Sequence, residues 1–220
     1  MSQLALELPQ SSPPHAPSQR YGGVSLLARL LARHVGDQAF AQAHRLLDAH
    51  RDIGGVVQAA QTMPAAHLLL PEAAAEDLCL LQDLALELAR DQIDDRDAIS
   101  SFSALLNYVK ARLQHRTTEC VYVLLLDKKN KLIGEKLLSE GTIDHAPVYP
   151  REIAKMCLLH DASAVILVHP HPSGDPTPSQ ADITMTKHLI DVLKPLGVVV
   201  HDHLVVGRQG TTSMKSTGLL

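Results

Sequence analysis

Two histidines separated by one residue stand at the end of an apolar run, and an aspartate follows a short distance later. The stretch reads VILVHPHPSGDPTPSQAD, residues 165–182, and the three side chains are His169, His171 and Asp182. Two imidazoles and one carboxylate are suitable ligands for Zn²⁺, and three protein ligands leave a fourth tetrahedral position for water or substrate. The pattern is therefore typical of a catalytic zinc site, where the pKa of the bound water falls to about 7.

A second interpretation treats the histidines as polar residues at the rim of a proline-rich turn. Pro170 cannot donate a hydrogen bond to a sheet, so the sequence predicts that regular strand pairing ends there. The segment TPSQ then predicts a helix start, with Thr177 as N-cap, Pro178 at the first helical position and Gln180 completing a capping box. Such a helix would bring Asp182 back toward the end of the strand, and this favours the metal site.

The alternation of side chains along a strand supports the same choice. It predicts that His169 and His171 project to one face of the sheet. The chain also contains a control, VVVHDHLVV at 198–206, in which His201 and His203 have the same spacing. This second pair lies in the middle of a strand and no Ser-x-x-Asp helix follows it, so we interpret it as structural.

The residues around the histidines alternate between predicted strands and predicted helices. Apolar and β-branched runs predict strands at 120–127, 131–142, 162–169 and 197–207, of which the first two form a hairpin. Apolar residues at helical spacing predict helices at 100–114, 149–161 and 177–197. The order indicates an α/β sandwich, which must hold the histidines at the end of one strand.

The first part of the chain has a different pattern. Residues 21 to about 90 read as helical throughout, and the helix at 76–91 is expected to bury Leu78, Leu81, Leu84 and Leu88. The charged run at 90–100 is interpreted as a linker. The domain boundaries expected from these patterns are a disordered tail at 1–20, a helical domain at 21–97 and an α/β domain at 98–220.

Composition narrows the possible functions. Residues 1–100 contain 7 Lys and Arg against 13 Asp and Glu, an acidic balance that is unfavourable for binding nucleic-acid phosphates. Cys79, Cys120 and Cys157 are odd in number and widely spaced, so we expect free thiols in a reducing, cytoplasmic environment. The longest apolar runs fall far short of the roughly 20 residues that a membrane span needs, and the N-terminus lacks the pattern of a signal peptide.

The segment HPHPSGDPTPSQAD resembles the JAMM (MPN+) metalloprotease pattern of His-x-His-Pro followed by Ser-x-x-Asp. With LLDKKNKLIGEKLLSEGTIDHAPVYPREIAK before it and GVVVHDHLVVG after it, the chain is more closely similar to the bacterial RadC (JAB-domain) proteins over about residues 100–220. The resemblance implies a JAB/MPN (cytidine-deaminase-like) three-layer α/β domain preceded by a small helical domain. It also implies that His169, His171 and Asp182 bind zinc, that Ser179 hydrogen-bonds the developing oxyanion, and that Glu119 is the general base.

The function that follows from this resemblance is zinc-dependent hydrolysis of a peptide or isopeptide bond in an unidentified peptide or protein substrate. The alternatives are a DNA-repair-associated accessory protein that binds nucleic acid and a metal-free scaffold. The scaffold is disfavoured because every expected ligand is present. DNA binding is disfavoured because residues 68–79, LLLPEAAAEDLC, lack the Gly-rich hairpin of RadC-like proteins and are acidic. Pro170 also replaces the asparagine that such proteins usually have between the two histidines.

Overall fold

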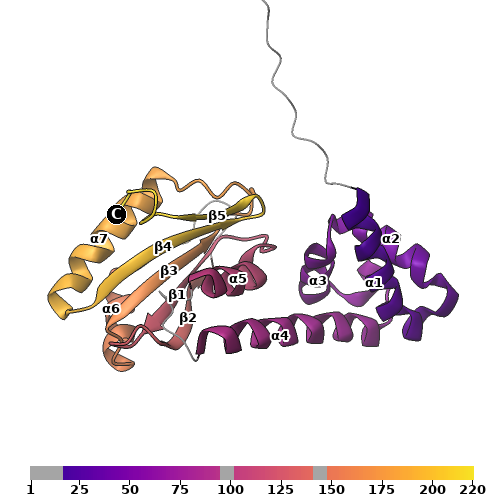
Figure 1. The fold of residues 1–220 in the computed structure, drawn as a ribbon, viewed down its shortest axis with the longest axis horizontal. Helices are drawn as coiled ribbons and strands as arrows, with labels where there is room; N and C mark the ends of the chain where they lie inside the picture. The colour runs from indigo at the N-terminus through magenta and orange to yellow at the C-terminus, as the bar shows by residue number, and fades with distance from the viewer. Residues whose placement is uncertain (1–16, 95–101, 141–147) are drawn as a thin grey trace, which may run out of the picture. The chain divides into compact units, whose positions relative to one another are not determined.

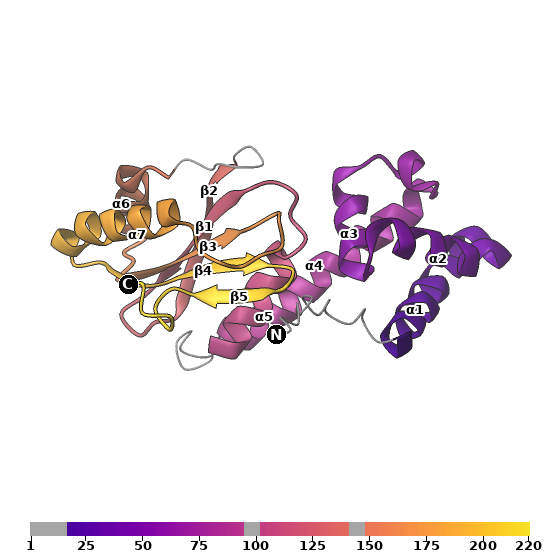
Figure 2. The same ribbon diagram turned by 90° about the horizontal axis from the view of Figure 1, so that it is seen from above.

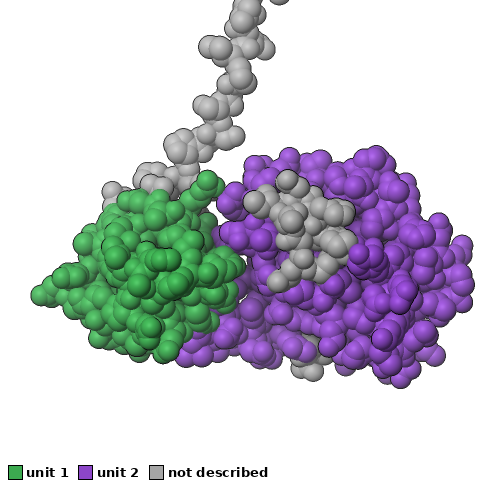
Figure 3. Space-filling model, turned by 180° about the vertical axis from the view of Figure 1, so that it is seen from behind, with its two compact units in different colours: residues 1–79 green, residues 80–220 purple. Residues whose placement is uncertain are grey.

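The structure is a computed structural model that describes residues 17–94, 102–140 and 148–220. Residues 1–79 form one compact unit and residues 80–220 form a second (Figure 3). We call them the helical unit and the α/β unit and describe each by itself.

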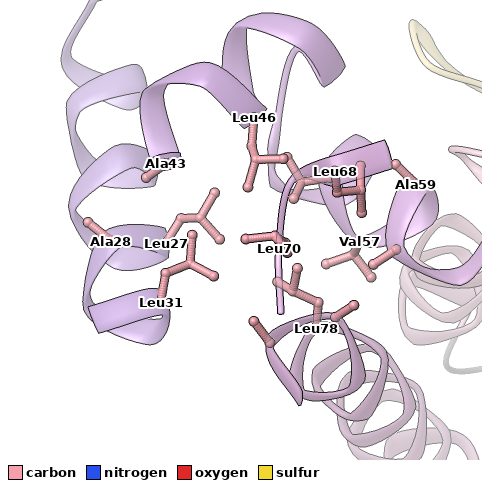
Figure 4. Packing of buried hydrophobic residues seen from close by; sticks show 14 of the residues in the cluster. Leu27, Ala28, Leu31, Ala43, Leu46, Val57, Ala59, Leu68, Leu70 and Leu78 are labelled. Carbon is pink, nitrogen blue, oxygen red and sulfur yellow. The ribbon is translucent and has the colours of Figure 1, made fainter. Parts of the chain in front are cut away.

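The helical unit packs its helices around a core of leucines, alanines and valines. Its elements are α1 (Pro17–Val35), η1 (Gly36–Gln38), α2 (Ala39–His50), α3 (Ile53–Thr62), η2 (Ala65–Leu68) and the start of α4 (Glu72–Asp94). Leu27, Leu31, Leu46 and Leu68 are buried between these helices (Figure 4). The expected helical domain is thus present. Of the expected tail, residues 1–16 lie outside the described residues and residues 17–20 belong to α1, with a proline at its first position.

The buried face expected for α4 is wrong in three of its four residues. Leu78 is buried in the helical unit, but Leu81, Leu84 and Leu88 are 43%, 54% and 57% exposed. The helix changes its packing partner along its length: Leu78 belongs to the core of one unit, and Ile93 is fully buried in the core of the other. With about 100° per residue, Leu78, Ala89 and Ile93 lie within about 60° of one another around the helix, whereas Leu81, Leu84 and Leu88 project to a different side and stay exposed.

The division between the units also differs from the expected boundary at 97/98. It falls at 79/80, within α4, because Leu86, Ala89 and Ile93 of that helix pack into the α/β unit. The charged run was expected to lack an apolar face, yet α4 continues through it to Asp94 and buries Ile93. Residues 95–101, the rest of the expected linker, lie outside the described residues.

The α/β unit is built on one five-stranded sheet. Its elements are α5 (Phe102–Leu113), β1 (Cys120–Leu126), β2 (Leu132–Glu140), α6 (Pro150–Leu159), β3 (Ala164–Pro170), α7 (Gln180–Leu193), η3 (Lys194–Leu196), β4 (Val199–Gly207) and β5 (Gly210–Ser213). The strand order is β2-β1-β3-β4-β5. β3 and β4 are parallel and the other neighbours are antiparallel. The predicted hairpin, strands and helices are confirmed, and β5 is an addition that the sequence did not predict.

Alternate residues of the central strands pack into two separate hydrophobic cores, one on each face of the sheet. Val123 of β1 and Val165 and Leu167 of β3 face α6 and α7, whereas Leu124 of β1 and Ile166 of β3 face α5. Figures 1 and 2 show α6 and α7 on one side of the sheet and α5 on the other. The unit therefore has the three-layer α/β architecture expected from the sequence.

Two predictions made from composition can be compared with the structure. The three cysteines are thiols that are not joined in disulfides; Cys120 and Cys157 are buried and Cys79 is partly buried. Burial raises the pKa of the Cys157 thiol to about 11. Among the described helices, none is both long enough and apolar enough to cross a membrane.

Candidate metal centre

The two histidines of the apolar run lie together at the end of β3. They have the same strand parity as Val165 and Leu167, so they face α7 as those residues do. The ring centroids of His169 and His171 are 4.8 Å apart in an edge-to-face arrangement. The expected shared face is confirmed, and His169 is buried there, with 6% of its surface exposed.

Regular strand pairing ends at Pro170, as expected from the sequence, and among the described residues only one further backbone hydrogen bond to β4 follows it. Pro170 is the last residue of β3 and is paired with Val206 of β4, and His171 N still donates to Val206 O at 2.8 Å. Backbone N–H groups alternate between the two edges of a strand, so the position of Pro170 N faces the β1 side. Pairing with β1 has already ended at Val168 and Tyr122. The missing N–H therefore removes no ladder hydrogen bond.

The ring of His171 is oriented by a backbone carbonyl. Its Nδ1 lies 2.8 Å from Asp175 O, and because a carbonyl only accepts, Nδ1 carries the proton. The lone pair is then on Nε2, which lies 3.6 Å from Asp182 Oδ2. Asp182, and to a smaller extent Asp175 O, raise the pKa of His171 above its usual value. An imidazole fixed in this way through one nitrogen is typical of a metal ligand that binds through the other.

The helix that returns Asp182 begins later than expected. Its N-cap is Ser179, whose Oγ accepts from Asp182 N at 3.2 Å, while Asp182 Oδ2 accepts from Ser179 N at 2.8 Å. The predicted capping box, with Thr177 as N-cap and Gln180 as its partner, is therefore wrong. The reason is local: Thr177 N and Oγ1 both donate to Asp175 Oδ1, at 2.9 and 2.7 Å, so this threonine belongs to the preceding turn.

The Asp182 carboxylate contacts both histidines. Oδ1 lies 3.1 Å from His169 Nδ1, and Oδ2, which faces His171, also accepts from Ser179 Oγ at 2.6 Å. Burial is the largest single effect on the pKa of Asp182 and raises it. The two histidines and Ser179 together outweigh burial and hold that pKa well below its usual range. Asp182 is therefore an anion at neutral pH.

Glu119 completes the group from the neighbouring strand. It immediately precedes β1, and its Oε2 lies 3.7 Å from His169 Nε2. One nitrogen of each histidine and one oxygen of Glu119 all lie within 4.8 Å of one another. The structure thus brings together Glu119, His169, His171, Ser179 and Asp182, all five residues that the sequence and the resemblance selected.

The donor set fits a metal ion. Neither ring nitrogen of the buried His169 makes a hydrogen bond within the described residues. Nδ1 has the carboxylate of Asp182 at 3.1 Å, but Nε2 lies 3.7 Å from Glu119 Oε2. A buried polar group without a hydrogen-bond partner costs roughly 1–3 kcal/mol, and metal coordination would satisfy Nε2. The separations of 3.6 and 3.7 Å from the histidines to Asp182 and Glu119 are close to the roughly 3.3 Å expected between two tetrahedral ligands of zinc. Two imidazoles with carboxylate oxygens are a set that zinc accepts.

The second histidine pair is divided between two environments. His201 Nε2 lies 2.7 Å from Asn130 Oδ1, at the hairpin between β1 and β2. His203 is fully buried, and its ring stacks on that of His169 with centroids 5.9 Å apart. Burial lowers the pKa of His203 to about 3, so this imidazole is neutral. The sequence alone does not connect His203 with the site, because that requires the register of β4 against β3.

The loop that follows His171 is held against the end of β4. Arg208 Nη2 lies 3.4 Å from both Pro172 O and Ser173 O, and Gln209 N donates to Gly174 O at 3.0 Å. Gly174 has a φ of +92°, a conformation that favours glycine. These contacts place Asp175 O, and through it the ring of His171.

The three-layer fold and the histidines and carboxylates at one end of its sheet define a JAB-type α/β domain with a candidate metal centre. Residues 99–219 match the family model described as the RadC-like JAB domain. The chain is also 46% identical over 178 residues to a UPF0758 protein of Rhodobacter capsulatus, across 81% of this chain and 83% of that protein. The chain therefore belongs to the RadC family, as expected from the sequence.

Proposed function

We propose that this chain is a zinc-dependent metallohydrolase of the JAMM type that cleaves a peptide or isopeptide bond. The observation that carries the proposal is the buried His169, whose Nδ1 contacts Asp182 and whose Nε2 faces Glu119 without a hydrogen bond within the described residues. Membership of a JAB-domain family supports the same reaction class.

In this proposal His169, His171 and Asp182 hold the metal. Asp182 is favoured over Glu119 as the carboxylate ligand because the capping box and the contacts with both histidines fix it in place as an anion. A bound zinc ion would supply a Lewis acid for the substrate carbonyl and a lowered pKa for water.

Glu119 is the proposed general base. Its side chain is 17% exposed, so this residue is in contact with solvent. In this role Glu119 accepts a proton from the attacking water and passes it to the nitrogen of the leaving amine. Ser179 is proposed to donate to the oxyanion, for which its Oγ–H must turn away from Asp182 Oδ2.

Metal content is the first test. The full chain purified with zinc and without chelator should contain close to one zinc per chain by elemental analysis, and His169→Ala and His171→Ala should contain almost none. His160→Ala is the matched control, because this histidine is exposed at the end of α6. A folded wild-type chain that binds well below one zinc would refute the metal centre.

A second test distinguishes the proposed roles of Glu119 and Asp182. Glu119→Gln should keep zinc and lose turnover by about 10²- to 10⁴-fold, whereas Asp182→Asn should lose zinc affinity. Turnover is read by mass spectrometry of new termini in a library of linear and Lys-ε-linked branched peptides. Loss of zinc in Glu119→Gln and its retention in Asp182→Asn would reverse the two roles. No cleavage of either peptide type by the zinc-loaded wild type would refute the hydrolase assignment.

A further inference from the structure

A buried hydrogen-bond chain connects β4 to the first turns of α7 behind the metal centre. Its members are His203, Thr186 and Asp182. We propose that His203 and Thr186 are positioning residues, which fix Asp182 and His169 without themselves contacting metal or substrate. This inference rests on the metal-binding part of the proposed function.

The chain has a definite direction. Thr186 Oγ1 lies 2.6 Å from Asp182 O and 2.7 Å from His203 Nδ1, and Thr186 and His203 are both fully buried. A hydroxyl has one proton. If it goes to His203 Nδ1, then Nε2 carries a buried N–H that has no hydrogen-bond partner within the described residues. Orphaned N–H groups are rarer than under-satisfied acceptors. His203 Nδ1 therefore donates to Thr186, and Thr186 donates to Asp182 O.

A bulge in β4 places His203 in this position. Val165 pairs with Val200, but the next residue of β3, Ile166, pairs with Asp202, so His201 is an extra residue in β4. Such a bulge shifts the alternation of the residues that follow it. His203 then pairs with Leu167, which faces α7.

The same shift brings the imidazole of His203 against that of His169. The two ring planes differ by 24°. His169 thus has His203 on one side and the carboxylates of Asp182 and Glu119 at its two nitrogens. Its orientation is restricted by contacts from β4 as well as from α7.

Asp182 is the point where these contacts meet. Its carbonyl is held from β4 through Thr186, and its carboxylate is held by Ser179. A small movement of the first turn of α7 would therefore move the carboxylate relative to His169 and His171. Loss of partners that orient metal ligands typically weakens metal affinity by roughly 10- to 100-fold.

Threonines of the same helix provide a matched pair of variants. Thr184 Oγ1 donates to Gln180 O at 2.9 Å, the same bond within a helix that Thr186 makes to Asp182, but Thr184 is exposed. Thr186→Val should weaken Zn²⁺ and Co²⁺ binding by about tenfold in chelator competition and change the visible absorption of bound Co²⁺. Thr184→Val and Thr186→Ser should match the wild type in both measurements.

Variants of His203 distinguish the contribution of its ring to metal binding from the contribution of its hydrogen bond. His203→Phe keeps a ring beside His169 but removes the donor, and it should weaken Co²⁺ binding as Thr186→Val does. His203→Asn keeps a donor near the position of Nδ1 and should recover most of the affinity. The double variant with Thr186→Val and His203→Phe should be no weaker than either single variant, because both remove the same chain.

The results that would overturn this inference differ from the results that would refute the proposed function. Wild-type Co²⁺ affinity and absorption in folded Thr186→Val or His203→Phe, with folding checked by circular dichroism, would overturn the inference. Equal losses in His203→Asn and His203→Phe would also overturn it, since the donor would then have no role. A wild-type chain that binds neither metal would instead refute the proposed function.

Discussion

Gly207, the last residue of β4, should be essential for the metal centre although it contacts no proposed ligand. A Cβ atom at this position would lie 2.3 Å from Gly174 O, 2.8 Å from Gly174 C and 2.9 Å from Pro176 N. An ordinary contact between a saturated carbon and a carbonyl oxygen is roughly 3.3–3.6 Å. Gly207→Ala therefore requires the loop at 172–176 or the end of β4 to move by about 1 Å. Both neighbours are backbone atoms, so no side chain can rotate away.

This movement would reach the proposed ligands through Asp175. The carbonyl of Asp175 fixes the ring of His171, and the segment continues directly to Ser179 and Asp182. A misplacement of about 1 Å can cost roughly 100-fold in rate, which corresponds to about 2.7 kcal/mol. We expect Gly207→Ala to lose about this factor in turnover and to bind zinc more weakly.

The assay compares Gly207→Ala with a second strand glycine of the same sheet. A Cβ on Gly134 in β2 would meet only Leu125 Cδ1, at 3.7 Å, so Gly134→Ala should keep the wild-type zinc affinity. Zinc affinity is measured by chelator competition, and folding by thermal unfolding followed with circular dichroism. Gly207→Ala that binds zinc as tightly as Gly134→Ala would show that the loop does not position His171.

Two further predictions test the packing. Leu78→Ala should lower the free energy of unfolding by about 2–5 kcal/mol, because Leu78 is buried, whereas Leu84→Ala should change it by less than about 1 kcal/mol. Urea denaturation measures both free energies, and similar losses in the two variants would show that α4 buries both leucines. Cys157 should react with a thiol reagent at pH 7 more than about 100-fold more slowly in the native chain than in the urea-unfolded chain, because burial raises its pKa and blocks access. Mass spectrometry of the labelled peptides measures this rate, and equal rates would contradict the buried position.

The secondary structure around the site was predictable because its signals are local. Apolar and β-branched runs bounded by turn residues identified the strands that carry His169 and His203, and the sequence placed the two histidines of the candidate metal centre on one face. The selection of Glu119 came from the family resemblance. A single carboxylate before a strand has no local pattern that distinguishes it from other glutamates.

The predictions of the N-cap of α7 and of the buried face of α4 were wrong because several residues fit each role equally well by local sequence. Thr177 and Ser179 are both suitable N-caps, and the choice was made by Asp175, which uses the hydroxyl and amide of Thr177 in a turn. The leucines of α4 form a regular apolar stripe, but the helix serves two cores, and only tertiary packing decides which positions are buried.

The register between neighbouring strands was the information that the sequence lacked most. Strict alternation along residues 198–206 would place His201 and His203 on one face, and it does not say which residues of β3 lie beside them. The bulge at His201 decides this, and it places His203 against His169. His203, which the sequence alone indicates to be structural, thus lies beside His169 in the candidate metal centre.

The Ser-x-x-Asp spacing has a local explanation that precedes any metal chemistry. In this chain Ser179 and Asp182 form a capping box, and that geometry alone requires a side chain that can accept from the backbone three residues after the N-cap. The N-terminal end of α7 also favours a negative charge, which keeps the carboxylate ionised. The spacing by itself therefore indicates only a helix start. It indicates a metal centre when the helix begins beside a strand that ends in His169 and His171, because the same carboxylate then faces both imidazoles.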